Sequence, residues 1–269
     1  ITPFKDLAEG LAKQGIACVR YNKRSFSYGL KMVMDKKNII TVKEETIDDA
    51  IMAANLLKND SRIDTSKVFI IGHSMGGMLA PRIDAEGGNF RGLILMAGSP
   101  LPMEKIMLIQ LEEQLAEMKG LTKKIISKQL DKFTALFEGL YELTDEAAKA
   151  TKIGNGVTLY YFKEMESFRA DEYLKNCEKP VLIMQGDKDF QCKAEIDFAL
   201  YKNLLKEIAL NKLASVSTSA ECTFENFDLD YYPLPVDPNL GISPRNRMTA
   251  LLEYCKCYAE DFDTESESL

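Results

Sequence analysis

The strongest constraint on the fold of this chain is an apolar segment that runs directly into a glycine-rich turn. Residues 67–71 read KVFII, and residues 72–77 read GHSMGG. A short, continuous apolar run that ends in glycines is typical of a strand buried on both faces. Apolar residues at helical spacing follow over 76–85. The sequence therefore predicts a strand, a tight turn and a helix in immediate succession.

Similar units flank this one and predict an alternating order of helices and strands. The periodicity predicts helices over 3–13, from Thr46 and over 76–85, strands over 16–21, 67–71 and 92–96, and a loop over 22–42. Such alternation is typical of a mostly parallel sheet with right-handed crossovers and helices on both faces. We therefore predict the α/β class.

A mostly helical stretch then interrupts the alternation, and it is too long for an ordinary crossover. The sheet resumes with a strand over 180–185, followed by a helix over about 192–208. The later residues lose the strand pattern, apart from one helix over 247–259, and end in the acidic run DFDTESES, which we expect to be disordered. The expected division is a core at 1–101 and 178–210, a helical cap inserted at 102–177, and an atypical C-terminal segment at 211–269.

Composition excludes several classes of function. The net charge of −7 argues against nucleic acid as a partner, because phosphate binding needs clustered lysine and arginine. No apolar run reaches the length of about 18 residues that a membrane helix needs, so we expect no membrane span. The six cysteines are scattered, and Cys255 and Cys257 alone make a poor zinc site. Reduced thiols favour a cytoplasmic protein.

The turn at 72–76 fits the G-x-S-x-G pattern of a nucleophile elbow. Such a turn holds Ser74 in strained backbone angles, and the small residues Gly72 and Gly76 keep the neighbouring backbone from clashing. The hydroxyl then stands at a helix N-terminus, where the dipole favours an oxyanion and the N–H of Met75 supplies one donor. The alternative is a glycine-rich turn that binds phosphate or only packs.

A second candidate follows the strand at 180–185, in the sequence GDKDF. A carboxylate at the C-terminal end of a parallel strand reaches the crevice where ligands bind in open α/β sheets. There it can hold a histidine in one tautomer and stabilise the imidazolium. Asp189 is the better candidate for this role and Asp187 for turn formation, although both aspartates can be turn residues.

These features together resemble the α/β-hydrolase family, and within it the bacterial esterases and peptidase-like hydrolases grouped with serine aminopeptidases and dienelactone hydrolases. The matching stretches are PFKDLAEGLAKQGIACVRYNKR, TIDDAIMAANLLKND, SRIDTSKVFIIGHSMGGMLAPRI, GLILMAGSP and KPVLIMQGDKDFQC. With the cap they cover residues 1 to about 210. The resemblance implies Ser74 as nucleophile and Asp189 as triad acid, without a metal or organic cofactor. Arg24 matches a basic residue of the family, whereas Asn22 stands where Asp is usual.

Two parts of the family pattern are missing. The single histidine is His73, which leaves the elbow in another direction, so we interpret it as a packed residue below the elbow and not as the base. Where the family has a strand followed by a histidine, this chain reads LASVSTSAECTFENF. The loop with the second oxyanion donor, and the strand before it, would precede Ile1. That strand would lie between those at 16–21 and 67–71, so we expect an incomplete sheet.

Two explanations for these departures stay open. Either the chain is a truncated product whose reading frame shifts near residue 210, which we favour, or it is a variant with a rebuilt C-terminus and no base. For the intact protein we expect hydrolysis of a carboxylic ester or related acyl bond through an acyl-serine, with the cap shaping an apolar pocket for a small acyl substrate. The alternatives are a non-catalytic binding protein with this fold and an aminopeptidase that acts on short peptides.

Overall fold

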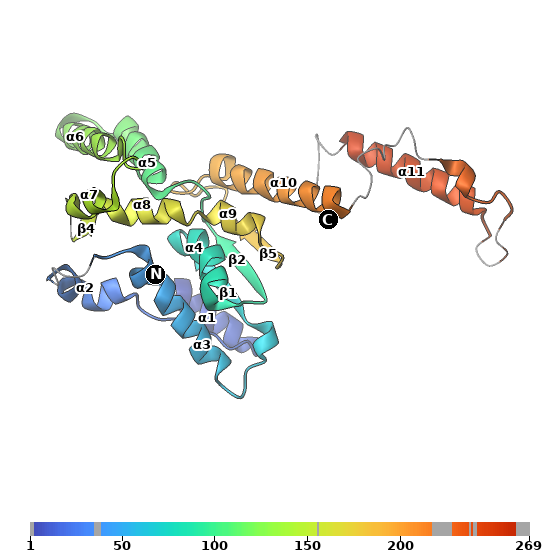
Figure 1. The fold of residues 1–269 in the computed structure, drawn as a ribbon, viewed down its shortest axis with the longest axis horizontal. Helices are drawn as coiled ribbons and strands as arrows, with labels where there is room; N and C mark the ends of the chain where they lie inside the picture. Colours follow the sequence, from blue (N-terminus) through green and yellow to red (C-terminus); the bar gives the residue numbers. More distant parts are fainter. Residues whose placement is uncertain are drawn as a thin grey trace. The chain divides into compact units, whose positions relative to one another are not determined.

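The computed structural model describes residues 3–34, 39–154, 156–216, 228–236, 238 and 241–261, and it divides the chain into two compact units at 1–207 and 208–269. The helices of the first unit are α1 (Pro3–Lys13), α2 (Arg24–Met34), α3 (Asp48–Lys58), α4 (Met75–Ile83), α5 (Met103–Glu117), α6 (Gly120–Phe137), α7 (Asp145–Ala150), α8 (Leu159–Ser167), α9 (Ala170–Lys175) and the first part of α10 (Ala199–Val216) (Figure 1). Short helical turns lie at Lys43–Ile47 (η1), Thr65–Lys67 (η2), Asp84–Gly88 (η3) and Ala194–Phe198 (η4).

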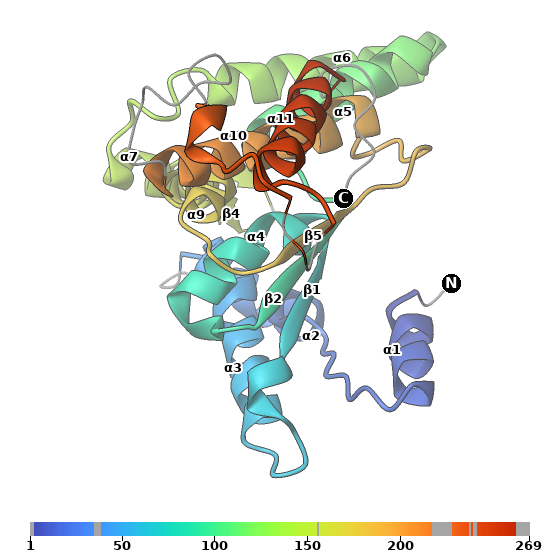
Figure 2. The ribbon, with the colours of Figure 1, turned by 90° about the vertical axis from the view of Figure 1, so that its right-hand side faces the viewer.

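Three parallel strands form the sheet of the first unit. They are β1 (Phe69–His73), β2 (Gly92–Met96) and β5 (Val181–Met184), and they lie side by side in that order (Figure 2). β2 and β5 lie where the sequence predicts a strand, and β1 overlaps its predicted range of 67–71 but continues to His73. Short apolar runs of this kind are typical of buried parallel strands. Helix α4 connects β1 to β2, and α5 to α9 lie between β2 and β5, which provides the long crossovers that parallel neighbours need. The predicted α/β class with a parallel sheet is confirmed.

Helix α4 covers one face of this sheet. On β2, Leu93 is 1% exposed and Leu95 is fully buried. The helix approaches the strand ends closely because glycines meet there: a Cβ on Gly77 would lie 3.2 Å from the Cα of Gly98. This close packing fixes the first turn of α4 against the C-terminal end of the sheet.

The opposite face of the sheet carries exposed apolar side chains. Paired residues of parallel strands point to the same face, and Ile71, Ile94 and Leu182 are paired across the three strands. Ile71 is 38% exposed and Leu182 is 53% exposed, and Phe69 on the same face is 50% exposed. The described helices therefore cover the sheet on the α4 face and leave much of the other face accessible.

The strand predicted over 16–21 does not form. The segment joins no ladder, and Ile16 is 52% exposed and Val19 39% exposed. A strand needs a hydrogen-bonded neighbour, and within the described residues the outer edge of β1 has none. The segment 16–21 is therefore not part of this sheet.

The prediction of a loop over 22–42 was also wrong, because residues 24–34 form helix α2. Its glycine and lysines suggested a loop, but a long-range ion pair holds its first turn. The guanidinium of Arg24 donates to both carboxylate oxygens of Asp49, and its Nε lies 3.0 Å from Oδ2. A partner 25 residues away leaves no local signal in the sequence.

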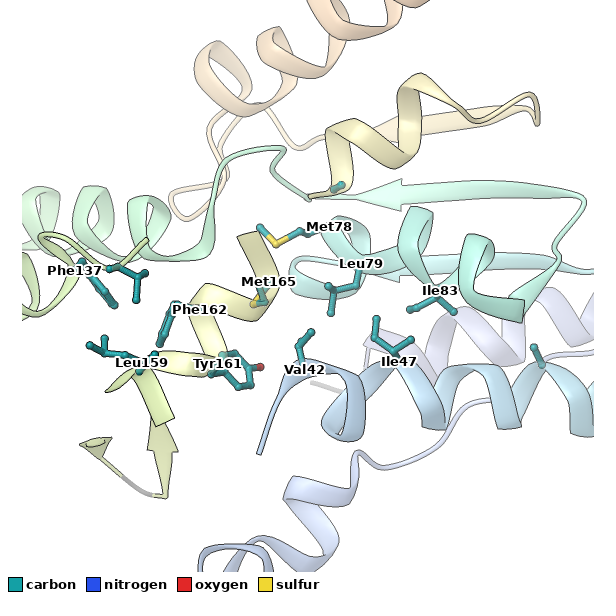
Figure 3. Close-up of a cluster of buried hydrophobic side chains, with 14 of the residues drawn as sticks. Val42, Ile47, Met78, Leu79, Ile83, Phe137, Leu159, Tyr161, Phe162 and Met165 are labelled. Carbon is teal, nitrogen blue, oxygen red and sulfur yellow. The ribbon is translucent and has the colours of Figure 1, made fainter. Parts of the chain in front are cut away.

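The main cluster of buried apolar side chains joins α4 to the helices of the expected cap (Figure 3). Its labelled members are Val42 and Ile47 before and within η1, Met78, Leu79 and Ile83 on α4, and Phe137, Leu159, Tyr161, Phe162 and Met165 on α6 and α8. Burial of each large side chain of this kind contributes roughly 1.5–3 kcal/mol. The mostly helical insert also contains a short antiparallel hairpin of β3 (Lys152–Gly154) and β4 (Val157–Thr158), where Gly156 has a φ of 81°.

The second unit contains the end of α10, a 3₁₀ turn at Leu229–Tyr231 (η5) and α11 (Pro244–Asp261), which includes the helix expected over 247–259. Arg245 links the last two elements: its Nε donates to the carbonyl of Tyr232 at 2.9 Å, and its guanidinium pairs with Asp230 at 2.8 Å. Residues 217–227, and residues 262–269 of the acidic run, lie outside the described residues. Over the described ranges, no helix has both the length and the apolar character needed to cross a bilayer.

Candidate active site

Ser74 lies at the junction between β1 and α4, with φ 53° and ψ −119°. A positive φ is uncommon for a residue with a side chain and is maintained only where the surroundings enforce it. Here the Ser74 N–H donates to the carbonyl of Met96 on β2 at 2.9 Å, and its own carbonyl accepts from the N–H of Met78 at 3.0 Å. The side chain is exposed. The junction thus presents a hydroxyl to solvent at the C-terminal edge of the sheet.

In this turn, Gly72 has no space for a side chain, whereas Gly76 does. A Cβ on Gly72 would lie 2.1 Å from the carbonyl oxygen of Gly76 and 2.7 Å from the nitrogen of Gly77. A Cβ on Gly76 meets no atom within 4 Å. The sequence predicted that both positions need a small residue, but only the first is sterically restricted in this backbone.

Met75 is the first residue of α4 and follows Ser74 directly. The first N–H groups of a helix have no acceptor within the helix, and the helix dipole places partial positive charge there. An oxygen anion held beside Ser74 would meet this end of α4. This position makes the N–H of Met75 a candidate oxyanion donor.

Asp189 lies in the loop after β5, at the same C-terminal edge of the sheet as Ser74. Because β2 separates β1 from β5, the two loops leave strands about 10 Å apart. The Oδ1 atom of Asp189 accepts the N–H groups of Gln191 at 2.9 Å and Cys192 at 3.1 Å. The side-chain amide of Gln185 closes the loop by donating to the carbonyl of Cys192 at 2.6 Å. One carboxylate oxygen therefore shapes the loop, while Asp187 is exposed.

His73, the single histidine of the chain, is the last residue of β1. Its side chain is exposed, and its ring meets the ring of Phe4 edge-on at a centroid distance of 5.5 Å. Alternation along the strand places it with Phe69 and Ile71 on the accessible face of the sheet. This is a partly packed surface position, in place of the packed position that the sequence suggested.

Two polar residues beside the elbow were not found from the sequence. Tyr161 of α8 is 8% exposed, and its hydroxyl donates to Oε2 of Glu45 at 2.7 Å. The same hydroxyl lies 3.8 Å from the sulfur of Met75. Burial, and then the negative charge of Glu45, raises the pKa of Tyr161 far above its ordinary value. Residues 45 and 161 come from segments far apart in the chain, so no spacing rule connects them.

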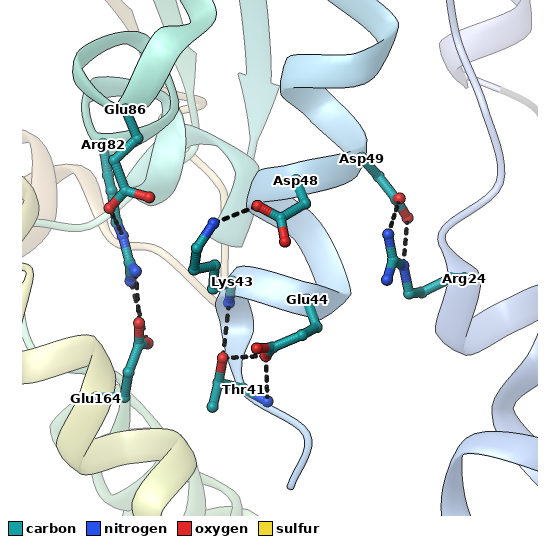
Figure 4. A network of polar contacts seen from close by, with 9 residues as sticks. All are labelled: Arg24, Thr41, Lys43, Glu44, Asp48, Asp49, Arg82, Glu86 and Glu164. Atoms are coloured by element: carbon teal, nitrogen blue, oxygen red, sulfur yellow. Dashed lines mark hydrogen bonds and ion pairs between the residues drawn. The ribbon is translucent and has the colours of Figure 1, made fainter. Parts of the chain in front are cut away.

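A network of charged side chains lies at the other end of α4 (Figure 4). The guanidinium of Arg82 is 1% exposed and donates to both oxygens of Glu164 and, through Nε, to Glu86 at 2.6 Å. Burial opposes the charge of Arg82, but these hydrogen bonds keep its pKa above the ordinary value. At the helical rise of 1.5 Å per residue, Arg82 lies about 12 Å along α4 from Ser74. An open cavity of about 720 Å³ borders this network.

No group of histidine, cysteine, aspartate and glutamate side chains within the described residues could hold a metal ion. What the geometry brings together at the C-terminal edge of the sheet is an exposed serine hydroxyl, the start of a helix and an aspartate loop. This set suits covalent chemistry on an acyl group more than coordination of an ion.

Comparison with known protein families identifies the family of this chain. Residues 1–213 match the family model described as serine aminopeptidase, S33. The chain belongs to this family. The S33 family is a group of α/β hydrolases, which agrees with the resemblance inferred from the elbow and the strands.

Relatives of this S33 chain include esterases. Esterase EstD of Thermotoga maritima is 30% identical over 188 residues, which cover 70% of this chain and 41% of that protein. The crystal structure of acetyl xylan esterase 1 from Thermoanaerobacterium sp. JW/SL YS485 is 18% identical with a TM-score of 0.36, and the match covers 70% of this chain and 50% of that chain. The chain thus spans less than half the length of the curated relative that it matches.

Proposed function

We propose that the protein is a serine hydrolase that cleaves a carboxylic ester or related acyl bond through an acyl-serine intermediate, with Ser74 as the nucleophile. The observation that supports this most is the left-handed φ of 53° at Ser74, at a junction between a parallel strand and a helix. A strained turn of this kind exposes the hydroxyl above the sheet edge. Membership of the S33 family and the likeness to an esterase agree with this proposal.

In the proposed reaction, the Oγ of Ser74 attacks the acyl carbon while a base accepts the hydroxyl proton. The N–H of Met75 stabilises the oxyanion, and the leaving alcohol departs with the proton that the base took up. Water then attacks the acyl-serine, which releases the carboxylic acid and restores the hydroxyl. Asp189 orients the base, and two loop N–H groups hold its Oδ1 in place.

The base of this reaction is not His73, because that ring lies against Phe4 on the accessible face of the sheet. An imidazole at Asp189 is therefore not supplied by these 269 residues, whose single histidine is His73. The chain spans 41% of EstD, and we place the base in the part of the enzyme that this chain does not include. The substrate class we propose is a small acyl ester bound under the helices of 102–177.

Hydrolysis of p-nitrophenyl esters of increasing acyl length, compared with aminoacyl p-nitroanilides, tests this function in the full-length protein. We expect turnover of the esters that Ser74→Ala abolishes and that Ser167→Ala, an exposed serine of α8, leaves unchanged. Preference for the anilides would assign the protein to the aminopeptidases instead. Ester turnover that survives Ser74→Ala would contradict the proposal.

A non-catalytic binding protein is the second candidate, and one observation favours it: the 269 residues contain no histidine that can reach Asp189. A serine without a base reacts slowly. Under this hypothesis the full-length protein binds acyl compounds without turnover. Calorimetric binding of a non-hydrolysable ester analogue, together with no product from the ester, would support it over the hydrolase.

A further inference from the structure

A tyrosine from the helical insert reaches the proposed oxyanion residue. The hydroxyl of Tyr161 on α8 lies 3.8 Å from the sulfur of Met75 and 2.7 Å from Oε2 of Glu45. It therefore contacts both the first residue of α4 and a carboxylate in η1. These three residues come from three segments that are distant in sequence.

Tyr161 is held firmly in this position. Its side chain is 8% exposed, and its ring packs edge-on against the ring of Phe162 at 5.6 Å. Figure 3 shows it between the cap side chains around Leu159 and the core side chain of Val42. A buried aromatic ring has few alternative rotamers, so the hydroxyl stays where the packing places it.

Glu45 is held from its own side as well. It lies within η1, where its neighbours Thr46 and Ile47 are buried. Lys23 lies near the same carboxylate: burial lowers the pKa of Lys23, and the charge of Glu45 opposes that shift. The phenol of Tyr161 is the donor of this hydrogen bond, and burial together with the charge of Glu45 raises its pKa further above the neutral range.

Met75 depends on such contacts for its orientation. A methionine side chain has three rotatable bonds and adapts to whatever surface it meets. Its backbone N–H begins α4 directly after the strained Ser74, so a fixed side chain limits how this peptide group can rotate. An oxyanion donor must be aimed to within a few tenths of an ångström of the developing charge.

We propose that Tyr161, through its hydrogen bond to Glu45, is a positioning residue that fixes Met75 and thereby aims the oxyanion N–H beside Ser74. The inference rests on the proposed function. It also gives the helical insert a second role, because α8 then sets the geometry of the reacting group as well as covering it. Displacement of α8 would release Met75 and slow the acylation of Ser74.

The variants Tyr161→Phe and Glu45→Gln test this inference, with Tyr160→Phe as a matched control on the same helix. Tyr161→Phe keeps the ring and removes the hydroxyl. Glu45→Gln keeps an oxygen that can accept a hydrogen bond from the hydroxyl of Tyr161. Two readouts are needed in the full-length protein: NMR of ¹³C-methyl-labelled methionines, with the Met75 signal assigned from Met75→Leu, and the saturation kinetics of Ser74 labelling by a fluorophosphonate.

We expect Tyr161→Phe to shift the Met75 methyl signal and to lower the maximal labelling rate about tenfold, with the half-saturating probe concentration unchanged. Glu45→Gln should retain most of the rate, and Tyr160→Phe should change neither readout. An unmoved Met75 signal, or a labelling rate equal to that of Tyr160→Phe, overturns the inference while leaving the proposed function intact. A wild-type protein that is not labelled at Ser74 overturns the proposed function and this inference with it.

Discussion

At Gly72 the backbone of the elbow turns so tightly that a methyl group has no space. The nearest atoms to an added Cβ are backbone atoms of Gly76 and Gly77, at 2.1 Å and 2.7 Å. Backbone cannot rotate aside as a flexible side chain can, so the first turn of α4 would have to move away from β1. The proposed nucleophile, Ser74, and the proposed oxyanion donor, Met75, both depend on that turn.

We therefore expect Gly72→Ala to lower the free energy of unfolding by about 3 kcal/mol, as overpacking of a tight site does. Gly76→Ala is the matched control, because its Cβ meets no atom within 4 Å, and it should change stability by less than about 1 kcal/mol. Urea denaturation followed by circular dichroism measures both. Equal losses for the two variants would contradict the steric account.

Cys192 offers a second test at the scale of one residue. Burial, together with the charges of Asp197 and Asp189, raises the pKa of its thiol from 9.0 to about 11. The folded state thus favours the neutral thiol, and its contribution to stability is present below pH 9 and is lost as the pH rises toward 11.

At pH 8 we expect iodoacetamide to modify exposed Cys18 at least tenfold faster than buried Cys192. Peptide mapping by mass spectrometry at timed intervals gives both rates. In 6 M urea the two rates should converge, because unfolding removes the burial. Equal rates in the native protein would show that the loop after β5 is open.

At the scale of elements, a buried ion pair joins α4 to α8. Arg82 is 1% exposed and Glu164 is 8% exposed, so both charges are removed from water and depend on each other. The ring of Phe168 lies 4.1 Å from the guanidinium carbon and adds a cation–π contact. Removal of Arg82 leaves the buried carboxylate of Glu164 without this partner, which costs about 3–5 kcal/mol.

We expect Arg82→Met to lose stability of that order, and Arg82→Met combined with Glu164→Met to recover part of the loss. Arg62→Met is the control, because the side chain of Arg62 is 86% exposed in its pair with Asp60, and its loss should hardly change stability. Thermal denaturation of the wild type and of these three variants measures the losses. Arg82→Met with an effect as small as that of Arg62→Met would contradict the account.

The elements that the sequence predicted best are those whose signal is local. The β1–turn–α4 unit could be predicted because its apolar run and glycines are contiguous, and so could β2 and β5. The segment 16–21 has a strand-like composition but lacks a neighbour to pair with, and α2 depends on an ion pair with Asp49. The contact between Tyr161 and Glu45 joins residues that are 116 positions apart, so no local pattern in the sequence could have predicted it.

At the scale of the whole first unit, the sheet has one covered and one accessible face. Leu93 and Ile71 lie on adjacent strands and point to opposite faces, and they are 1% and 38% exposed. A large accessible apolar surface can bind amphipathic dyes. A polar substitution on such a surface also destabilises the fold less than one in the core.

We expect Ile71→Thr combined with Leu182→Thr to reduce the fluorescence of bound anilinonaphthalene sulfonate and to cost less than about 1 kcal/mol of stability, since both side chains are already partly in water. Leu93→Thr, on the covered face, should cost about 3 kcal/mol. Dye titration and urea denaturation measure the two effects. Unchanged dye binding in the double variant would mean that this face is covered in solution.

The central claim is that Ser74 is a nucleophile, and active-site labelling tests it most directly. A fluorophosphonate probe should modify the full-length protein at one peptide, the one that contains GHSMGG, and Ser74→Ala should abolish the labelling while Ser167→Ala leaves it unchanged. The 269-residue chain itself should label much more slowly, because the ring of its single histidine, His73, lies against Phe4 on the accessible face of the sheet. Absence of labelling in the full-length protein, or labelling that persists in Ser74→Ala, would contradict the account.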